Sequence, residues 1–125
     1  MAIAAVLDAR HLDGGWGLSR KIAGLTLVQR AVRMVSVNGV SDIIIWASEA
    51  NADAVRAEAA RAKTRQLSTV VTHFGGLKAA VGVVSEVLIL DVRTVFHRGM
   101  IKDLAALPVA EPTALKVGAR WWMRC

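Results

Sequence analysis

Three glycines and two basic residues lie close together in residues 13–21, DGGWGLSRK. Glycines allow backbone N–H groups to approach a phosphate closely, and basic side chains offset its charge. The candidate phosphate-binding residues of this stretch are Gly14, Gly15, Gly17, Arg20 and Lys21. The glycine spacing fits neither GxGxxG nor GxxxxGK[ST]. The structural alternative is a long loop that turns around Trp16 and attracts an anion only through its basic residues.

A second candidate is Asp91, which follows the apolar run EVLIL. Ligands of open α/β sheets bind at the carboxyl ends of strands, so Asp91 is the candidate metal ligand. Arg93 is two residues further on, and an ion pair between the two is the alternative. The histidines are His11, His73 and His97. No cysteine or second histidine stands at ligand spacing, which disfavours a zinc site.

The composition bounds the possible functions. The chain has 125 residues, 54% of them hydrophobic, and a formal net charge of +6. This length predicts one core, and a positive field attracts phosphates, from nucleotides to anionic lipid. The basic residues are dispersed and no nucleic-acid motif is present, which disfavours nucleic acid as a partner. A single cysteine and no apolar run of membrane-spanning length predict a cytoplasmic location.

Apolar runs alternate with amphipathic segments along most of the chain. The expected strands are residues 2–7, 42–47, 68–73 and 86–92. The expected helices are residues 24–38, a helix capped by Ser48 or Asn51 that ends near Arg65, 77–84 after a break at Gly75 and Gly76, and 99–107. This alternation predicts an α/β fold with a mostly parallel sheet.

Proline residues at 108 and 112 mark a predicted boundary between an α/β domain, 1–107, and a basic tail, 108–125. A helical tail would place Lys116, Arg120 and Arg124 on one stripe. The residues through which the tail would meet a partner are Lys116, Arg120, Trp121, Trp122 and Arg124. Such a segment suits a membrane surface or a protein partner; tryptophans that fold back onto the domain are the alternative.

Two long segments resemble the sugar-phosphate and inositol-phosphate nucleotidyltransferases. Residues 21–48, KIAGLTLVQRAVRMVSVNGVSDIIIWAS, are similar to the part of that family that follows the nucleotide loop. Residues 86–107, EVLILDVRTVFHRGMIKDLAAL, are similar to the part that carries its metal-binding aspartate. The resemblance implies a three-layer α/β/α sandwich, truncated relative to the family, with a Rossmann-like sheet in strand order 3-2-1-4.

The residues that perform the family's chemistry are replaced. In place of the nucleotide loop LAAGxGTR stands VLDARHLDGG, so that Arg10 occupies the position of the first glycine. Leu18 stands near the place of the catalytic lysine. Arg93 in LDVR replaces the aspartate that holds Mg²⁺. The resemblance therefore implies a degenerate domain without catalysis that serves in binding, assembly or regulation.

Two alternatives remain open. A rearranged site of Arg10, Arg20, Lys21 and Asp91 could still make the chain part of an active Mg²⁺-dependent nucleotidyltransferase for a sugar or inositol phosphate. The tail could instead make it an interaction module at the inner face of a membrane. Related domains are fused ahead of CDP-alcohol phosphotransferase membrane domains, so the resemblance also implies a membrane-bound phosphotransferase as a neighbour. A nucleotide, a phosphorylated small molecule and a second copy of the chain are further candidate partners.

Overall fold

The computed structural model describes residues 3–13, 16–82, 86–93, 103, 113–117 and 120–124. The strands of the main sheet are β1 (Ile3–Asp8), β4 (Asp42–Trp46), β5 (Ser68–Val71), β6 (Glu86–Asp91), β7 (Thr113–Val117) and β8 (Arg120–Arg124). The short strands β2 (Lys21–Ile22) and β3 (Leu25–Thr26) pair separately. The helices are α1 (Trp16–Ser19), α2 (Leu27–Val37), α3 (Ala52–Arg61) and α4 (Phe74–Val81).

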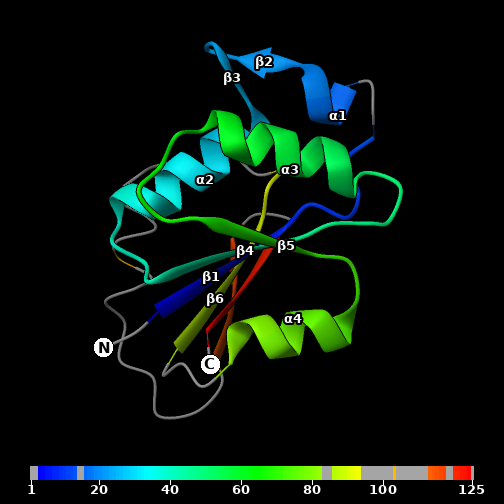
Figure 1. Ribbon diagram of the computed structural model, residues 1–125. Helices are drawn as coiled ribbons and strands as arrows, with labels where there is room; N and C mark the ends of the chain where they lie inside the picture. The colour runs from blue at the N-terminus through cyan, green and yellow to red at the C-terminus, as the bar shows by residue number, and fades with distance from the viewer. Residues whose placement is uncertain are drawn as a thin grey trace.

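The main sheet has the order β5-β4-β1-β6-β8-β7. Strand β1 pairs in parallel with β4 and β6, and β4 pairs in parallel with β5. The helices α2 and α3 cover one face of the sheet and α4 covers the other (Figure 1). The predicted α/β sandwich is therefore confirmed, and its four parallel strands have the predicted order 3-2-1-4.

Strand β1 is buried on both faces, which explains its unbroken apolar sequence. Ala5 and Leu7 belong to the core that includes residues of α2 and α3, whereas Ala4 and Val6 belong to the core that includes Leu77 of α4. Successive side chains of a strand point to opposite faces, so a strand between two helical layers must be apolar at every position.

Helix α2 begins at Leu27, not at residue 24 as expected, and ends where the sequence predicts. Thr26 caps its first turn, with Oγ1 accepting a hydrogen bond from the Gln29 N–H (3.3 Å). The buried residues Val28, Val32 and Val35 recur at helical spacing and face the sheet. Gly39 follows the helix with a φ of +75°, a conformation that favours glycine.

The predicted break at Gly75 and Gly76 is wrong. Both glycines lie in the first turn of α4, which begins at Phe74 and not at residue 77. His73 precedes the helix, and its Nδ1 accepts a hydrogen bond from the Gly76 N–H (2.9 Å). A Cβ on Gly76 would lie only 3.2 Å from Cε1 of this imidazole. The two glycines thus make room for the His73 side chain that caps the helix. Because glycine usually disfavours helices, the sequence did not suggest this role.

The tail does not form the helix considered for it. Its residues 113–117 and 120–124 form the antiparallel pair β7 and β8, and β8 pairs with β6 through Leu88 opposite Arg124 and Ile89 opposite Met123. The tail therefore extends the sheet. Of the expected helix over 99–107, only Asp103 is described, and it is helical; the rest lies outside the described residues, as do His97, Gly14 and Gly15. Within the described ranges, no helix has the length and apolar character needed to cross a membrane.

Candidate functional site

Two aspartates end the two neighbouring strands at the centre of the sheet. Asp8 ends β1 and Asp91 ends β6, and the two residues are paired in register. From β1 the chain proceeds to β4 on one side, whereas β6 lies on the other side, so the strand order reverses between β1 and β6. Ligands of open α/β sheets bind outside the carboxyl ends of strands at such a reversal. Asp8 and Asp91 thus lie where a ligand site is expected.

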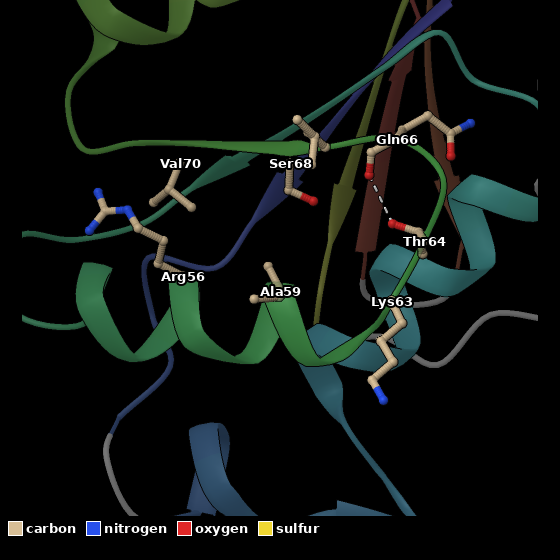
Figure 2. Close-up of a pocket in the computed structure, with 9 residues that line it drawn as sticks. Arg56, Ala59, Lys63, Thr64, Gln66, Ser68 and Val70 are labelled. Carbon is tan, nitrogen blue, oxygen red and sulfur yellow. Dashed lines mark hydrogen bonds between the residues drawn. The ribbon is translucent and has the colours of Figure 1, made fainter.

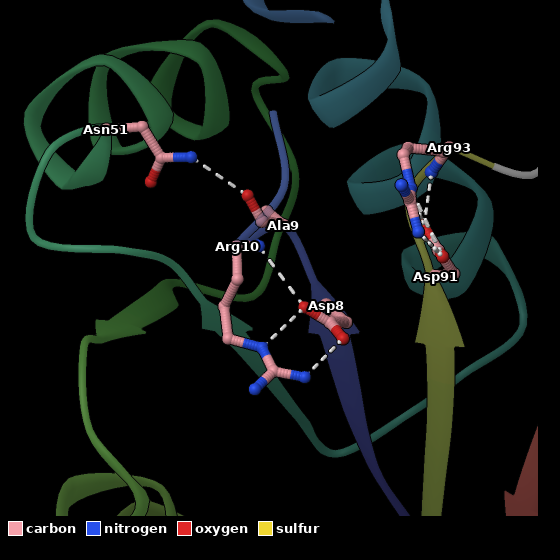
Figure 3. A network of polar contacts seen from close by, with 6 residues as sticks. All are labelled: Asp8, Ala9, Arg10, Asn51, Asp91 and Arg93. Carbon is pink, nitrogen blue, oxygen red and sulfur yellow. Dashed lines mark hydrogen bonds and ion pairs between the residues drawn. The ribbon is translucent and has the colours of Figure 1, made fainter. Parts of the chain in front are cut away.

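Each aspartate forms a bidentate ion pair with the arginine two residues later (Figure 3). In the first pair, Nε of Arg10 donates to Oδ1 of Asp8 (3.0 Å) and Nη2 donates to Oδ2 (2.9 Å). The backbone N–H of Arg10 also donates to Oδ1 (3.2 Å). The second pair repeats this pattern: the corresponding bonds from Arg93 to Asp91 measure 3.1, 2.8 and 2.9 Å. The sequences DAR and DVR therefore fold into the same turn on adjacent strands.

These ion pairs favour the charged forms of Asp8, Arg10 and Arg93. Burial alone would raise the pKa of Asp8, as does the nearby charge of Asp91, but the hydrogen bonds and charge of Arg10 outweigh both and lower it. The pKa values of Arg10 and Arg93 are raised, mainly by their hydrogen bonds to Asp8 and Asp91. Each carboxylate is 19% exposed, and the two guanidinium side chains are 39% and 38% exposed. The pairs are thus accessible to a ligand from the arginine side.

Mg²⁺, which the resemblance implies, does not fit these residues as they are arranged. Magnesium prefers carboxylate and water oxygens in a nearly ideal octahedron. Here Oδ1 and Oδ2 of both aspartates accept bonds from guanidinium groups, which repel a cation. Among the described residues, no three acidic, histidine or cysteine side chains gather as a metal site. The predicted alternative for Asp91, an ion pair with Arg93, is what the structure shows.

An aromatic side chain supports the first ion pair. The Cζ atom of Arg10 lies 3.7 Å from the ring centroid of Trp46, the last residue of β4. Phe74 packs against the same indole, with ring centroids 6.5 Å apart at an angle of 54°. A guanidinium over an indole face gains a cation–π interaction. Trp46 thus fixes Arg10 beside Asp8, a role that the sequence pattern did not suggest.

The loop after β1 is held by Asn51. Its Nδ2 donates to the carbonyl oxygens of Ala9 (2.9 Å) and Leu12 (2.8 Å), and its Oδ1 accepts from the N–H of Ser48 (2.9 Å). Asn51 occupies the N-cap position of α3, as expected. Its side chain makes no capping hydrogen bond, however, so the predicted capping role of this side chain is wrong. Its amide instead ties the start of α3 to the loop that carries Arg10 (Figure 3).

The described part of the glycine stretch packs as a short helix. Gly17 lies in α1, where a Cβ would approach Leu12 to 3.1–3.3 Å, so only glycine fits without displacing it. Leu18, near the place of the family's catalytic lysine, is 6% exposed and belongs to the core. Arg20 and Lys21 are exposed. The side chain of Trp16 lies outside the description.

A cavity of about 310 Å³ brings part of the glycine stretch together with one ion pair. It is lined by His11, Leu12, Asp13, Gly17, Ile22, Leu27 and Arg93. Gly17 and Arg93 therefore border the same space, whereas Arg10 is turned toward Trp46. Of the candidate phosphate-binding residues, Gly17 therefore lies on the cavity side of the carboxyl edge of the sheet, and Arg10 lies on the side of Trp46.

The fold defined by these strands and helices is nucleotidyltransferase-like. Solved structures with this fold include a 4-diphosphocytidyl-2C-methyl-D-erythritol synthase from Anaerococcus prevotii (TM-score 0.64, 18% identity, 91% of this chain and 59% of that one). A nucleotidyl transferase from Methanothermobacter is similar at a TM-score of 0.58 and 14% identity, over 91% of this chain and 65% of that one.

The protein Rv0371c of Mycobacterium tuberculosis H37Rv is similar at a TM-score of 0.63 and 15% identity, over 83% of this chain and 58% of that one. This chain therefore spans only about three-fifths of the length of the three structures. No model of a protein family and no curated protein matches the sequence. At these identities, the likeness establishes the fold alone.

Replacing Asn51 tests how strongly the loop depends on it. Asn51→Ala removes the side-chain donor from the carbonyl of Leu12 and leaves the carbonyl of Ala9 with only the 3.3 Å bond from the Leu12 N–H. We therefore expect a loss of about 2–3 kcal/mol in unfolding free energy, measured with urea. Asn38→Ala is the matched control, because it removes one bond to Met34 O at a partly exposed helix end. Equal losses in the two variants would contradict the loop-holding role.

The pH dependence of stability tests the first ion pair. Above about pH 4 the wild type has the full stabilisation from ionised Asp8, and it loses this as the pH falls through the lowered pKa. Arg10→Met keeps the burial and the backbone bond but removes the two guanidinium bonds and the charge. Burial, the largest influence on Asp8, should then raise its pKa above 3.8. The ionised carboxylate then destabilises the variant at neutral pH, and this penalty disappears on acidification.

We therefore expect the stability difference between wild type and Arg10→Met to be largest near neutral pH and to shrink below about pH 5. Urea unfolding across this range and NMR titration of the Asp8 carboxyl group measure it. Arg56→Met, which removes an ion pair to the fully exposed Asp53, should show no such dependence. A stability difference that is constant with pH would refute the coupling between Arg10 and Asp8.

Proposed function

We propose that this chain is a nucleotidyltransferase-like domain without catalysis that serves in binding, assembly or regulation. The observation that carries the proposal is the pair of bidentate ion pairs, Asp8 with Arg10 and Asp91 with Arg93, at the reversal of strand order. An enzyme of this kind needs carboxylates that are available to a metal ion at this position. Here arginine guanidinium groups occupy them.

Further observations support the loss of catalysis. Leu18 packs in the core where a lysine would have to reach a phosphate. The sheet has the strand order of the family, and the aspartates at the carboxyl ends of β1 and β6 are paired with arginines. This combination suits a role in recognition.

The ligand that we propose is a nucleotide or another phosphorylated small molecule, bound without a metal ion. Arginine pairs readily with phosphate oxygens through its planar fork of donors, and both Arg10 and Arg93 are more than one-third exposed. The exposed Arg20 and Lys21 would add positive charge on the side of Gly17. Gly14, Gly15 and Gly17 complete the phosphate-binding residues of the proposal.

Catalysis in a partial chain is the second candidate, and one observation favours it. Asp8 and Asp91 stand in register on adjacent strands, the arrangement in which two carboxylates can share a cation. A phosphorylated substrate that drew Arg10 and Arg93 away would expose these oxygens to Mg²⁺. Arg20 and the acceptor site of another domain or chain would then complete the machinery.

Calorimetry with CTP, UTP, ATP and GTP separates the two candidates. We expect the wild type to bind nucleotides no more tightly with Mg²⁺ than without it, and to release no pyrophosphate with sugar or inositol phosphates. The variant Arg10→Gly with Arg93→Asp removes both guanidinium groups and adds a carboxylate. It should gain Mg²⁺-dependent nucleotide binding of about tenfold or more.

The matched control is Lys78→Asp with Arg65→Gly, which changes the net charge by the same amount away from the carboxyl edge. It should leave the Mg²⁺ dependence unchanged. Pyrophosphate release by the wild type that is lost in the Arg10 and Arg93 variant would overturn the proposal and establish the second candidate.

A membrane-bound phosphotransferase remains the neighbour that we propose for the tail, on the strength of its basic, tryptophan-rich sequence. Deleting residues 113–125 would remove two strands of the sheet, so charge substitutions are the sharper test. Co-sedimentation with vesicles of one-third anionic lipid should fall about tenfold in Lys116→Glu with Arg120→Glu and Arg124→Glu. Equal sedimentation of the wild type and this variant would remove the membrane from the proposal.

A further inference from the structure

Strand β5 forms an open edge of the sheet, because among the described strands it pairs with β4 alone. The N–H of Ala47 donates to the carbonyl oxygen of Val71 (2.8 Å), so the backbone of Val71 faces β4. Alternate residues of a parallel strand direct their N–H and C=O groups to opposite sides. The backbone groups of Ser68 and Val70 therefore face away from the sheet.

A cavity of about 200 Å³ opens beside this edge, between β5 and α3. Figure 2 shows the side chains of Ser68 and Val70 extending from the strand toward the helix, where Ala59 faces them. The apolar part of the lining comes from Ala59, Ala60, Leu67 and Val70. Its size suits one aliphatic side chain that approaches along the strand edge.

Two cations and no acidic residue line this cavity. Arg56 lies on α3, whereas Lys63 lies two residues beyond the helix, with a φ of +54°. The ion pair of Arg56 with Asp53 (2.9 Å) is exposed, with Asp53 at 102% and Arg56 at 57%. Exposed ion pairs of this kind hold weakly, so the carboxylate of a partner can replace Asp53.

We propose that β5 binds an extended acidic segment of another protein, which adds a strand to this edge. The segment would bond to the outward backbone groups of Ser68 and Val70, place an apolar side chain in the cavity and direct carboxylates to Arg56 and Lys63. Residues four apart in a strand lie about 13 Å apart, so two carboxylates on one face of the segment can each meet one of the long side chains that line the cavity. Backbone bonds supply affinity in such complexes and the pocket supplies specificity.

The charge at this edge favours an acidic partner over a second copy of the chain. Two β5 edges in a symmetric pair would bring Arg56 and Lys63 of both copies together, and like charges opposed across an interface are costly. The net charge of +6 adds to that repulsion. This inference goes beyond the proposed nucleotide site. It does not depend on that site, because the ion pairs of Asp8 with Arg10 and of Asp91 with Arg93 lie outside β5 and α3.

The probe for this site is the peptide Thr-Glu-Thr-Val-Thr-Glu-Thr with blocked ends and a fluorophore. Its period of two places both glutamates and the valine on one face. Fluorescence anisotropy should show saturable binding to the full chain, weakened about tenfold or more by Arg56→Glu. Lys78→Glu makes the same charge change on α4, across the sheet, and should alter binding by less than about twofold.

Two control peptides separate backbone pairing from simple charge attraction. A version with lysine in place of glutamate, and a version N-methylated at the residues whose N–H groups would face β5, should both fail to bind. In the bound state, the amide protons of Ser68 and Val70 should exchange more slowly with solvent. Equal binding of the N-methylated peptide, or of the Arg56→Glu variant, would overturn the proposal. So would a dimer in sedimentation equilibrium that protects the same two amides without peptide, because the occupant would then be a second copy.

Discussion

The position of β1 is the constraint on which the rest of the structure depends. This strand is buried on both faces and is hydrogen-bonded on both sides, so its register with β4 and β6 leaves no freedom at its carboxyl end. A shift of one residue would turn every apolar side chain to the opposite face. Asp8 therefore meets Asp91 because of how the core packs, whatever chemistry the two carboxylates perform.

Two carboxylates brought together by packing have to be compensated. Each side chain is mostly buried, and the charge of Asp91 raises the cost of ionising Asp8. A metal ion is one solution, and an arginine on the following turn is another. In this chain the second solution is used twice, because the residue two positions beyond each aspartate can donate from both its backbone and its guanidinium. The same edge is thereby stable without a cation.

The parts of the structure that the sequence predicted are those with local causes. The four parallel strands follow from apolar runs, and the pairing of Asp91 with Arg93 follows from a spacing of two. The hydrogen bonds from Asn51 to the carbonyl groups of Ala9 and Leu12 join residues about 40 positions apart in the chain. No pattern in the neighbouring sequence predicts them. For Lys116, Arg120 and Arg124, a spacing of four satisfies the period of a helix and also the period of a strand. Pairing with β6, a tertiary interaction, decided between them.

The separation of scaffold and site explains how the fold can resemble nucleotidyltransferases while the residues at the carboxyl edge of the sheet differ. Apolar residues inside β1 and β6 determine the strand order, whereas the side chains of Arg10 and Arg93, just beyond the strands, are 39% and 38% exposed. Position 10 can therefore hold glycine or arginine, and position 93 aspartate or arginine, with the same core. Leu18 differs in this respect, because it is part of the core itself. A lysine at this position would bury its charge, so the packing of α1 disfavours one there.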